Sequence, residues 1–194
     1  MFADTSLIMQ RISESATVKS ALGADKSATN LIARVAQECA HSLSSGGKII
    51  FAGNGGSFGD AQHISAEFTS KLMRDRKSLA SIALGTNSSA MSAIANDYGY
   101  EYIFAREIES VANENDIAIL ITTSGNSRNI LLAAEAAIKK NIKVFGLTGQ
   151  SGGLLAAMCE CISVPSVETA RIQECHILIG HIIVELSEMS FLDL

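Results

Sequence analysis

The sequence predicts an α/β fold of the doubly wound type, in which a parallel sheet carries helices on both faces. Two observations lead to this prediction. Five short runs consist mainly of Ile, Val, Leu and Ala, as strands buried on both faces do, and helix-like segments separate most of them. The five runs occupy residues 48–52, 79–84, 116–121, 142–147 and 161–164.

Two helices are expected before the first of these strands. Leu31, Val35 and Cys39 recur at helical spacing, and a weaker pattern of the same kind surrounds Ile8 and Ile12. The two patterns are separated near residues 23–29, where the first helix should end and the second begin.

A long helix should close the chain from about Ala170. Its apolar stripe includes Ile172, Cys175 and Ile179, and further apolar residues beside the stripe widen it. A stripe this wide should be covered on more than one side, so helix contacts between subunits are expected. The only proline, Pro165, stands where the last strand should end.

Length and composition narrow the class of protein. The 194 residues are 47% hydrophobic, which is enough for a substantial core, and the mean hydropathy is +0.25. We expect one domain, with two helices over residues 1–45 and an α/β body with the last helix over residues 46–194. The net charge of −5 and the scattered basic residues argue against a nucleic-acid partner.

Targeting features point to the cytoplasm. No apolar run approaches the ~20 residues needed to cross a bilayer, and the start lacks a basic segment followed by an apolar one. No membrane partner is therefore expected. The four cysteines, Cys39, Cys159, Cys161 and Cys175, are expected to be reduced, because a chain of this length does not need disulfides.

The most informative segment reads GNGGSFGDAQHISAE, from residue 53 to residue 67. Its glycines follow the first buried run, so the chain should turn sharply and enter a helix near Ser57. On that helix His63 and Glu67 are four residues apart and share a face, where they could hold a metal ion or move a proton. The segment therefore joins a loop of the phosphate-binding type to a candidate metal or acid–base pair.

A second loop, TTSGNS over residues 122–127, follows the third strand-like run and precedes a helix. Hydroxyl groups and backbone N–H groups at a helix N-terminus favour an anion. One Ser or Thr would be enough to cap the helix, whereas this loop has four hydroxyl side chains. Since ligands of open α/β sheets bind outside the carboxyl ends of the strands, both loops could face the same ligand.

Two other readings of these patterns are weaker. A dinucleotide site needs G-x-G-x-x-G, but Phe58 occupies the third glycine position and Gly85 follows the second strand where an acidic residue is needed. A thiolate metal site could combine Cys159 and Cys161 with Cys175 and His176, but buried cysteine more often acts as a small hydrophobic residue.

The final helix contributes two further candidates, Gln173 and His181. His181 lies in an apolar stretch, where a lone histidine is more often a core residue bonded to backbone. The two residues are roughly 12 Å apart along a regular helix, so both side chains would have to lean toward a point between them to bind one ion.

Taken together, five ordered motifs resemble the phosphoheptose isomerases, a branch of the sugar isomerase (SIS) domain proteins. The motifs are GNGGS at 53–57, D-A-x-H-x-x-x-E at 60–67, A-N-D-Y-G at 95–99, TSGNS at 123–127 and A-R-I-Q-E-x-H at 170–176. The resemblance covers nearly the whole chain. It implies a flavodoxin-like, three-layer αβα sandwich with a five-stranded parallel sheet, usually assembled as a homotetramer.

The resemblance also implies a reaction and a set of site residues. The reaction converts sedoheptulose 7-phosphate to D-glycero-D-manno-heptose 7-phosphate for bacterial surface polysaccharide, lipopolysaccharide or capsule. The implied zinc ligands, one ion per subunit, are His63, Glu67, Gln173 and His181. The implied substrate contacts are Asn54, Gly55, Gly56, Ser57, Glu67, Asn96, Asp97, Thr122, Thr123, Ser124, Ser127 and Gln173. The sequence departs from some relatives by having Thr122 in place of Ser and no acidic residue at Thr169 or Ala170.

Chemistry supports the same residues. An aldose–ketose interconversion moves a proton between adjacent carbons through an enediol, so it needs a base and an acid. Glu67 and His181 supply these in either order, and a divalent cation could polarise the carbonyl oxygen. The alternative function is a non-catalytic SIS-type binding protein, either associated with the replication initiator or a sensor of a sugar phosphate. The presence of both Glu67 and His181 favours the enzyme.

Overall fold

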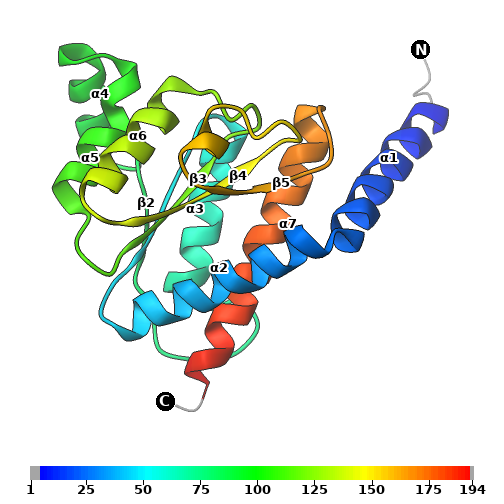
Figure 1. Cartoon of the computed structure of the whole chain (residues 1–194), viewed down its shortest axis with the longest axis horizontal. Coiled ribbons are helices and arrows are strands. Elements are labelled where there is room, and N and C mark those ends of the chain that lie inside the picture. The colour runs from blue at the N-terminus through cyan, green and yellow to red at the C-terminus, as the bar shows by residue number, and fades with distance from the viewer. Residues whose placement is uncertain (1–4, 193–194) are drawn as a thin grey trace.

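The computed structural model describes residues 5–192 and has the predicted five-stranded parallel sheet (Figure 1). The strand order is β2-β1-β3-β4-β5, so the direction of winding reverses between β1 and β3. The strands are β1 (Ile49–Gly53), β2 (Ser81–Ala83), β3 (Ile117–Ile121), β4 (Lys143–Thr148) and β5 (Glu160–Ser163).

Alternate strand residues point to opposite faces of the sheet, and each face has its own core. Ile49 and Phe51 belong to one cluster, whereas Ile50 and Ala52 belong to the other. The first face is covered by α2 (Lys26–Ser44), α3 (Gly56–Thr69) and α7 (Thr169–Glu188), and α1 (Thr5–Ala24) adds the buried Leu22 at its end. The second face carries α4 (Ser88–Asp97), α5 (Ile103–Val111) and α6 (Arg128–Lys139). Three short helical turns complete the chain, η1 (Tyr100–Tyr102), η2 (Leu155–Ala157) and η3 (Met189–Phe191).

The edge strand β2 is shorter than the predicted run at 79–84. The ends of that run still lie along β1, because Ile49 N–H donates to Ala80 O at 3.0 Å and Leu84 N–H donates to Phe51 O at 2.8 Å. Only the middle of the run keeps regular strand geometry, between residues 81 and 83.

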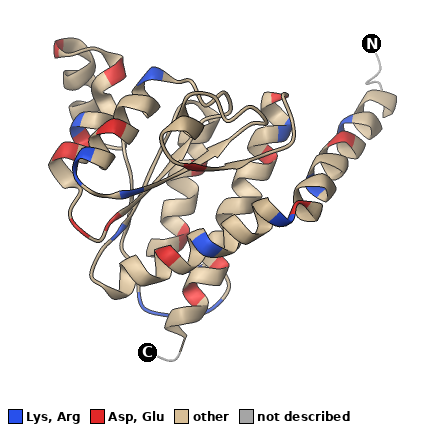
Figure 2. Cartoon of the chain, viewed as in Figure 1, with Lys and Arg blue, Asp and Glu red and all other residues tan. Residues whose placement is uncertain are grey.

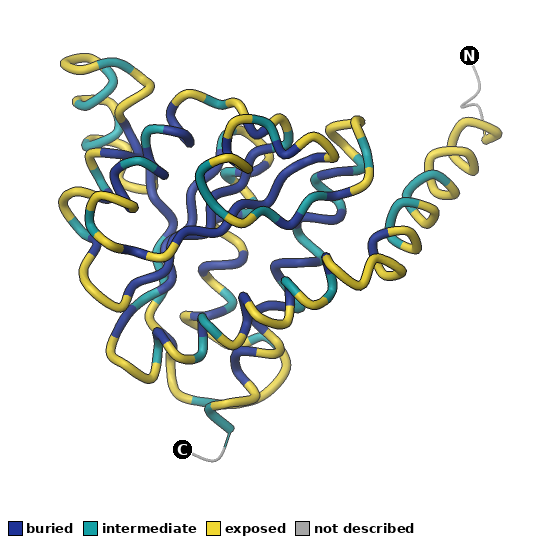
Figure 3. The backbone as a smooth tube through the Cα atoms, viewed as in Figure 1, coloured by how far each residue is buried: buried dark blue, intermediate teal, exposed yellow. Residues whose placement is uncertain are grey.

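The two N-terminal helices meet at Asp25, within the predicted break. The Asp25 carboxylate accepts hydrogen bonds from Ser27 N–H at 2.8 Å and Ala28 N–H at 3.2 Å, which caps α2. α1 extends away from the sheet and is exposed along most of its length (Figures 1 and 3). Among its exposed apolar side chains, Met9 is 72% and Ile12 66% exposed, so α1 presents an apolar surface outside the monomer core.

α3 and α7 run parallel to each other on the first face of the sheet (Figure 1). Gly180 of α7 lies so close to Ile64 of α3 that a Cβ atom at position 180 would be 2.3 Å from Ile64 Cδ1. Near the start of α3, a Cβ at Gly56 would similarly be 2.6 Å from Gln173 Nε2. The two contacts fix both the separation and the axial register of this helix pair.

Charged residues of both signs are interspersed over the molecule (Figure 2). Among the described residues, no helix combines the length and the apolar character that a membrane span requires.

The structure separates the residues of the alternative thiolate site. Cys159 and Cys161, with sulfur atoms 3.9 Å apart, pack against the core of the second face, whereas Cys175 belongs to the core of the first. The sheet lies between these two groups, so they cannot share an ion.

His176 is fully buried in α7, with its Nε2 atom 3.1 Å from Thr148 O. Burial lowers the pKa of the imidazole to about 4, because the charged form would lose its hydration. The neutral ring therefore donates through Nε2 to the carbonyl at the end of β4 and ties α7 to the sheet.

We expect His176 to make stability pH-dependent. Because its folded pKa of about 4 lies below the unfolded value of 6.5, the unfolded chain binds the proton first as pH falls. The contribution of this group is full above pH 6.5 and is lost between pH 6.5 and 4, by at most about 3 kcal/mol. Urea unfolding at several pH values should show this loss, and His176→Gln should remove it from the profile. An unchanged profile in that variant would contradict the assignment.

Candidate functional site at the switch point of the sheet

The two predicted loops lie side by side, at the carboxyl ends of adjacent strands. Gly53 at the end of β1 is in register with Ile121 at the end of β3, so Asn54 and Thr122 begin neighbouring loops. Gly55 has φ +55° and ψ −120°, a conformation that side chains disfavour, and α3 begins directly after it. The prediction of a sharp turn into a helix is confirmed.

A reciprocal amide pair joins these loops. Asn54 Nδ2 donates to Asn129 Oδ1 at 2.9 Å, and Asn129 Nδ2 donates to Asn54 Oδ1 at 2.8 Å. The hydroxyl of Tyr100 also donates to Asn54 Oδ1, at 3.1 Å. The Asn54 side chain is thus largely occupied by protein partners, which favours the backbone of this loop as the surface offered to a ligand.

The TTSGNS loop presents hydroxyl groups in front of α6. Thr122 Oγ1 lies 3.1 Å from Ser127 Oγ, and Ser124 Oγ accepts from Asn126 N–H at 3.1 Å. Gly125 has φ +68°, and a Cβ there would be only 2.0 Å from Gly152 O of the loop after β4. The loop is therefore held by backbone contact on one side and leaves Ser124 exposed on the other.

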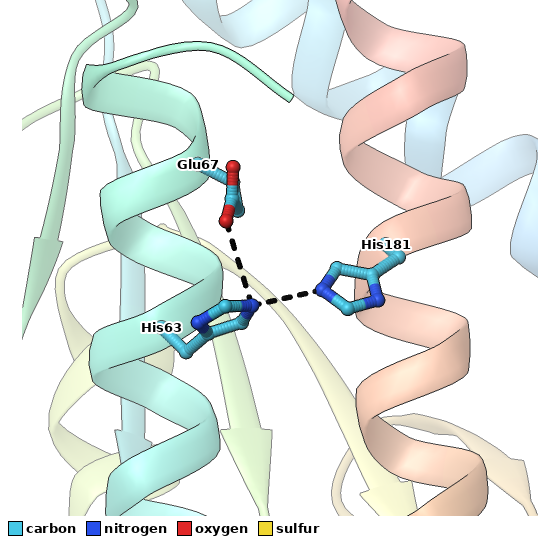
Figure 4. Close-up of side chains that lie close together, drawn as sticks. All are labelled: His63, Glu67 and His181. Carbon is cyan, nitrogen blue, oxygen red and sulfur yellow. Dashed lines mark hydrogen bonds and ion pairs between the residues drawn. The ribbon is translucent and has the colours of Figure 1, made fainter. Parts of the chain in front are cut away.

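His63, Glu67 and His181 converge between α3 and α7 (Figure 4). His63 Nε2 lies 2.9 Å from His181 Nε2 and 3.5 Å from Glu67 Oε1. The three donor atoms lie within 4.8 Å of one another. The side chain of His63 is 50% exposed and that of Glu67 20% exposed, so the group is open to small molecules.

Gln173 lies two turns below this group, with its amide against Gly56 at the start of α3. Asp60 stands between Gly56 and His63 on the same face of α3, and its Oδ2 atom is buried without a hydrogen-bond partner. Burial raises the pKa of the Asp60 carboxyl, and the nearby His63 partly offsets this rise. Polar groups thus line the whole path from the loops to the histidines.

The structure does not bring every predicted site residue together. Asn96 and Asp97 are exposed at the end of α4, where Asn96 Nδ2 donates to Asp97 Oδ1 at 2.7 Å. Within residues 5–192, no hydrogen bond or ion pair links these two side chains to the loops or to the histidines. Ser57, in the first turn of α3, is buried.

Sequence analysis missed two residues of the site. Asn129 is buried at 4% exposure, and the only available signal was a polar residue in the first turn of α6, directly before the apolar residues Ile130 and Leu131. Tyr100 was included in no motif, because its contact with Asn54 depends on how η1 packs.

Comparisons with known proteins agree with this architecture. Residues 15–149 match the model of the SIS domain family. The phosphoheptose isomerase of Aneurinibacillus thermoaerophilus is 50% identical over 182 residues, which cover 93% of this chain and 92% of that protein. Phosphoheptose isomerase 2 of Campylobacter jejuni is 47% identical over 184 residues, covering 94% of this chain and 92% of that protein.

A solved structure extends the agreement to three dimensions. The phosphoheptose isomerase of Francisella tularensis superimposes with a TM-score of 0.90 at 35% identity, covering 97% of this chain and all of that one. The fold and the two loops at its switch point define a SIS-domain protein. At this level of identity and coverage, the chain belongs to the phosphoheptose isomerase family.

The amide pair between the loops generates a prediction. Asn129→Asp should lower the free energy of unfolding by about 1–3 kcal/mol, since Asn54 Oδ1 loses a buried donor and faces a carboxylate. The exposed Asn30, on α2, gives the matched control, and Asn30→Asp should change stability by less than about 0.5 kcal/mol. Urea titration of both variants measures the difference, and equal stabilities would show that the pair contributes nothing.

Proposed function

We propose that this protein is an aldose–ketose isomerase that converts sedoheptulose 7-phosphate to D-glycero-D-manno-heptose 7-phosphate through an enediol. The observation that carries the proposal is the placement of His63, Glu67 and His181 two turns away from the hydroxyl- and glycine-rich loops. The separation along α3, from Gly56 to His63, is roughly 10 Å. A linear sugar with its phosphate at one end and its carbonyl at the other can occupy both places.

The phosphate is assigned to the loop end of the site. There the N-termini of α3 and α6 supply partial positive charge and unpaired backbone N–H groups. The hydroxyls of Ser124 and Ser127, with Thr122 and Thr123 beside them, add donors. Gly55, Gly56 and Ser57 contribute from the other loop, where the side chain of Asn54 is held by Asn129.

Proton transfer is assigned to Glu67 and His181. They lie on different helices and face a common space, so one can remove the proton from one carbon while the other serves the neighbouring oxygen. His63 lies against both, with its Nε2 atom 3.5 Å from Glu67 Oε1. In this arrangement His63 orients Glu67 and limits the positions the carboxylate can adopt.

The same residues suit a zinc ion, one per subunit. Two imidazole nitrogens and a carboxylate oxygen already converge, and this donor set is the one zinc prefers. Gln173 is proposed as the fourth ligand from the family resemblance alone, because its amide lies against Gly56, two turns from the other three residues, and would have to move toward them to bind the ion. When bound, the ion would polarise the sugar carbonyl and so assist removal of the adjacent proton.

The alternative, a non-catalytic SIS-type binding protein, would need the loops but not the converging acid–base group. Because Glu67 and His181 meet in the folded chain, we retain the enzyme. The contacts of Asn96 and Asp97 with substrate are proposed from the family resemblance. They would require α4 of one subunit to lie against the site of another subunit.

We further propose a homotetramer that acts in the cytoplasm and supplies heptose for lipopolysaccharide or capsule. The exposed apolar side chains of α1, with the exposed Leu186 of α7, support assembly, since surfaces of this kind are normally covered. Four free cysteines suit a reducing compartment.

The first test is catalytic. Purified protein incubated with sedoheptulose 7-phosphate should form the aldose, which chromatography of the sugar phosphates detects. Glu67→Gln and His181→Gln should each lower turnover about a hundredfold or more, because each removes a proton-transfer group. Gln62→Glu, at an exposed position of the same helix, is a control that should keep turnover. Near-normal turnover in either site variant would remove that residue from the mechanism.

The second test concerns the metal. Elemental analysis should find close to one zinc per chain, and a strong chelator should abolish activity that added zinc restores. His63→Ala should lose the ion together with the activity, whereas His41→Ala, which changes an exposed histidine on α2, should lose neither. Full activity of metal-free protein would leave Glu67 and His181 as an acid–base pair that works without an ion.

A further inference from the structure

Arg76 lies outside the proposed active site and joins the C-terminal ends of α3 and α7, the two helices that carry His63, Glu67 and His181. Arg76 Nε donates to Glu188 Oε2 at 3.1 Å, and Glu188 is the last residue of α7. The same guanidinium donates through Nη2 to Glu67 O at 2.9 Å and through Nη1 to Phe68 O at 2.9 Å. These carbonyls belong to the last turn of α3, which lacks partners within its own helix.

The pair is fully enclosed. The side chain of Arg76 is 0% exposed and that of Glu188 1% exposed. Nη1 also lies within hydrogen-bond distance of Ser70 O and Lys77 O, and Glu188 accepts from the backbone N–H of Met73 at 3.0 Å. Each of the three guanidinium nitrogens therefore has a partner, as a buried charge requires.

Stability alone does not account for a charged pair at this place. Desolvation of two charges offsets much of their attraction, and apolar residues of similar size often stabilise a core equally well. What a buried pair supplies in addition is a fixed geometry, because the planar guanidinium accepts only one arrangement of its partners. The partners here are the backbone of Glu67 and the end of the helix that carries His181.

We propose that Arg76, held by Glu188, is a positioning residue for His63, Glu67 and His181. The hydrogen bond to Glu67 O fixes the backbone of Glu67 itself, and the bond to Glu188 fixes α7 two turns beyond His181. Arg76 thereby sets the distance between the acid–base groups on the two helices. The effect on turnover rests on the proposed isomerase function, whereas the effect on the histidine rings does not.

Arg76→Lys is the critical variant. Lysine keeps the positive charge for Glu188, but it lacks the fork that reaches Glu67 O and Phe68 O together. We expect kcat for sedoheptulose 7-phosphate to fall about tenfold with KM within about twofold, since the loops lie at the other end of the helices. In protein labelled with 13C at the histidine rings, the signals of His63 and His181 should shift, whereas those of His41 and His176 should not.

Arg74→Lys provides the matched control, because Arg74 is exposed two residues away. It should leave turnover and all four ring signals as in the parent protein. If Arg76→Lys does not fold, Glu188→Gln takes its place, because glutamine keeps an acceptor of the same shape without the charge. That variant should change kcat and the two ring signals in the same direction.

The outcomes separate the two proposals. A variant that melts at a lower temperature but keeps kcat and the His63 and His181 signals would show that Arg76 only stabilises the fold, and it would overturn the inference. If the parent protein fails to isomerise sedoheptulose 7-phosphate, the proposed function falls, and the ring signals alone then decide whether Arg76 positions the histidines.

Discussion

The structure depends on the close parallel packing of α3 and α7. Gly180 allows the two helix backbones to approach at Ile64, and Gly56 makes room for the Gln173 amide near the other end of the contact. A larger residue at either position would push the helices apart in a tightly packed core. Because His63 and Glu67 come from one helix and His181 from the other, this packing decides whether the three side chains meet at all.

The fold class and the loops were accessible from the sequence because they depend on local patterns. Buried strands gave apolar runs, and the turn between β1 and α3 gave glycines, of which Gly55 does adopt a positive φ. The pairing of His63 with Glu67 followed from helical spacing. Their meeting with His181 came from family resemblance, since helix spacing within α7 says nothing about which residue of α3 lies opposite.

What the sequence did not disclose depends on tertiary contacts between unlike segments. Asn129 and Asn54 are 75 residues apart in the chain, and Arg76 and Glu188 are 112 apart. Neither pair has a recurring spacing or a composition that would mark it. Both are side-chain bonds between segments that the sheet or the helix packing brings together. The first pair joins the two loops of the site, and the second joins the ends of α3 and α7.

The spacing between the loops and the histidines also has a consequence for selectivity. Under the proposed function, the groups that bind the phosphate and the groups that move protons are both fixed to helices, roughly 10 Å apart along α3. This fixed separation makes the site sensitive to the length of the substrate. The carbonyl of a shorter sugar phosphate bound at the loops would not reach the histidines. The enzyme would therefore distinguish sugar phosphates by the length of the carbon chain more than by contacts with each hydroxyl.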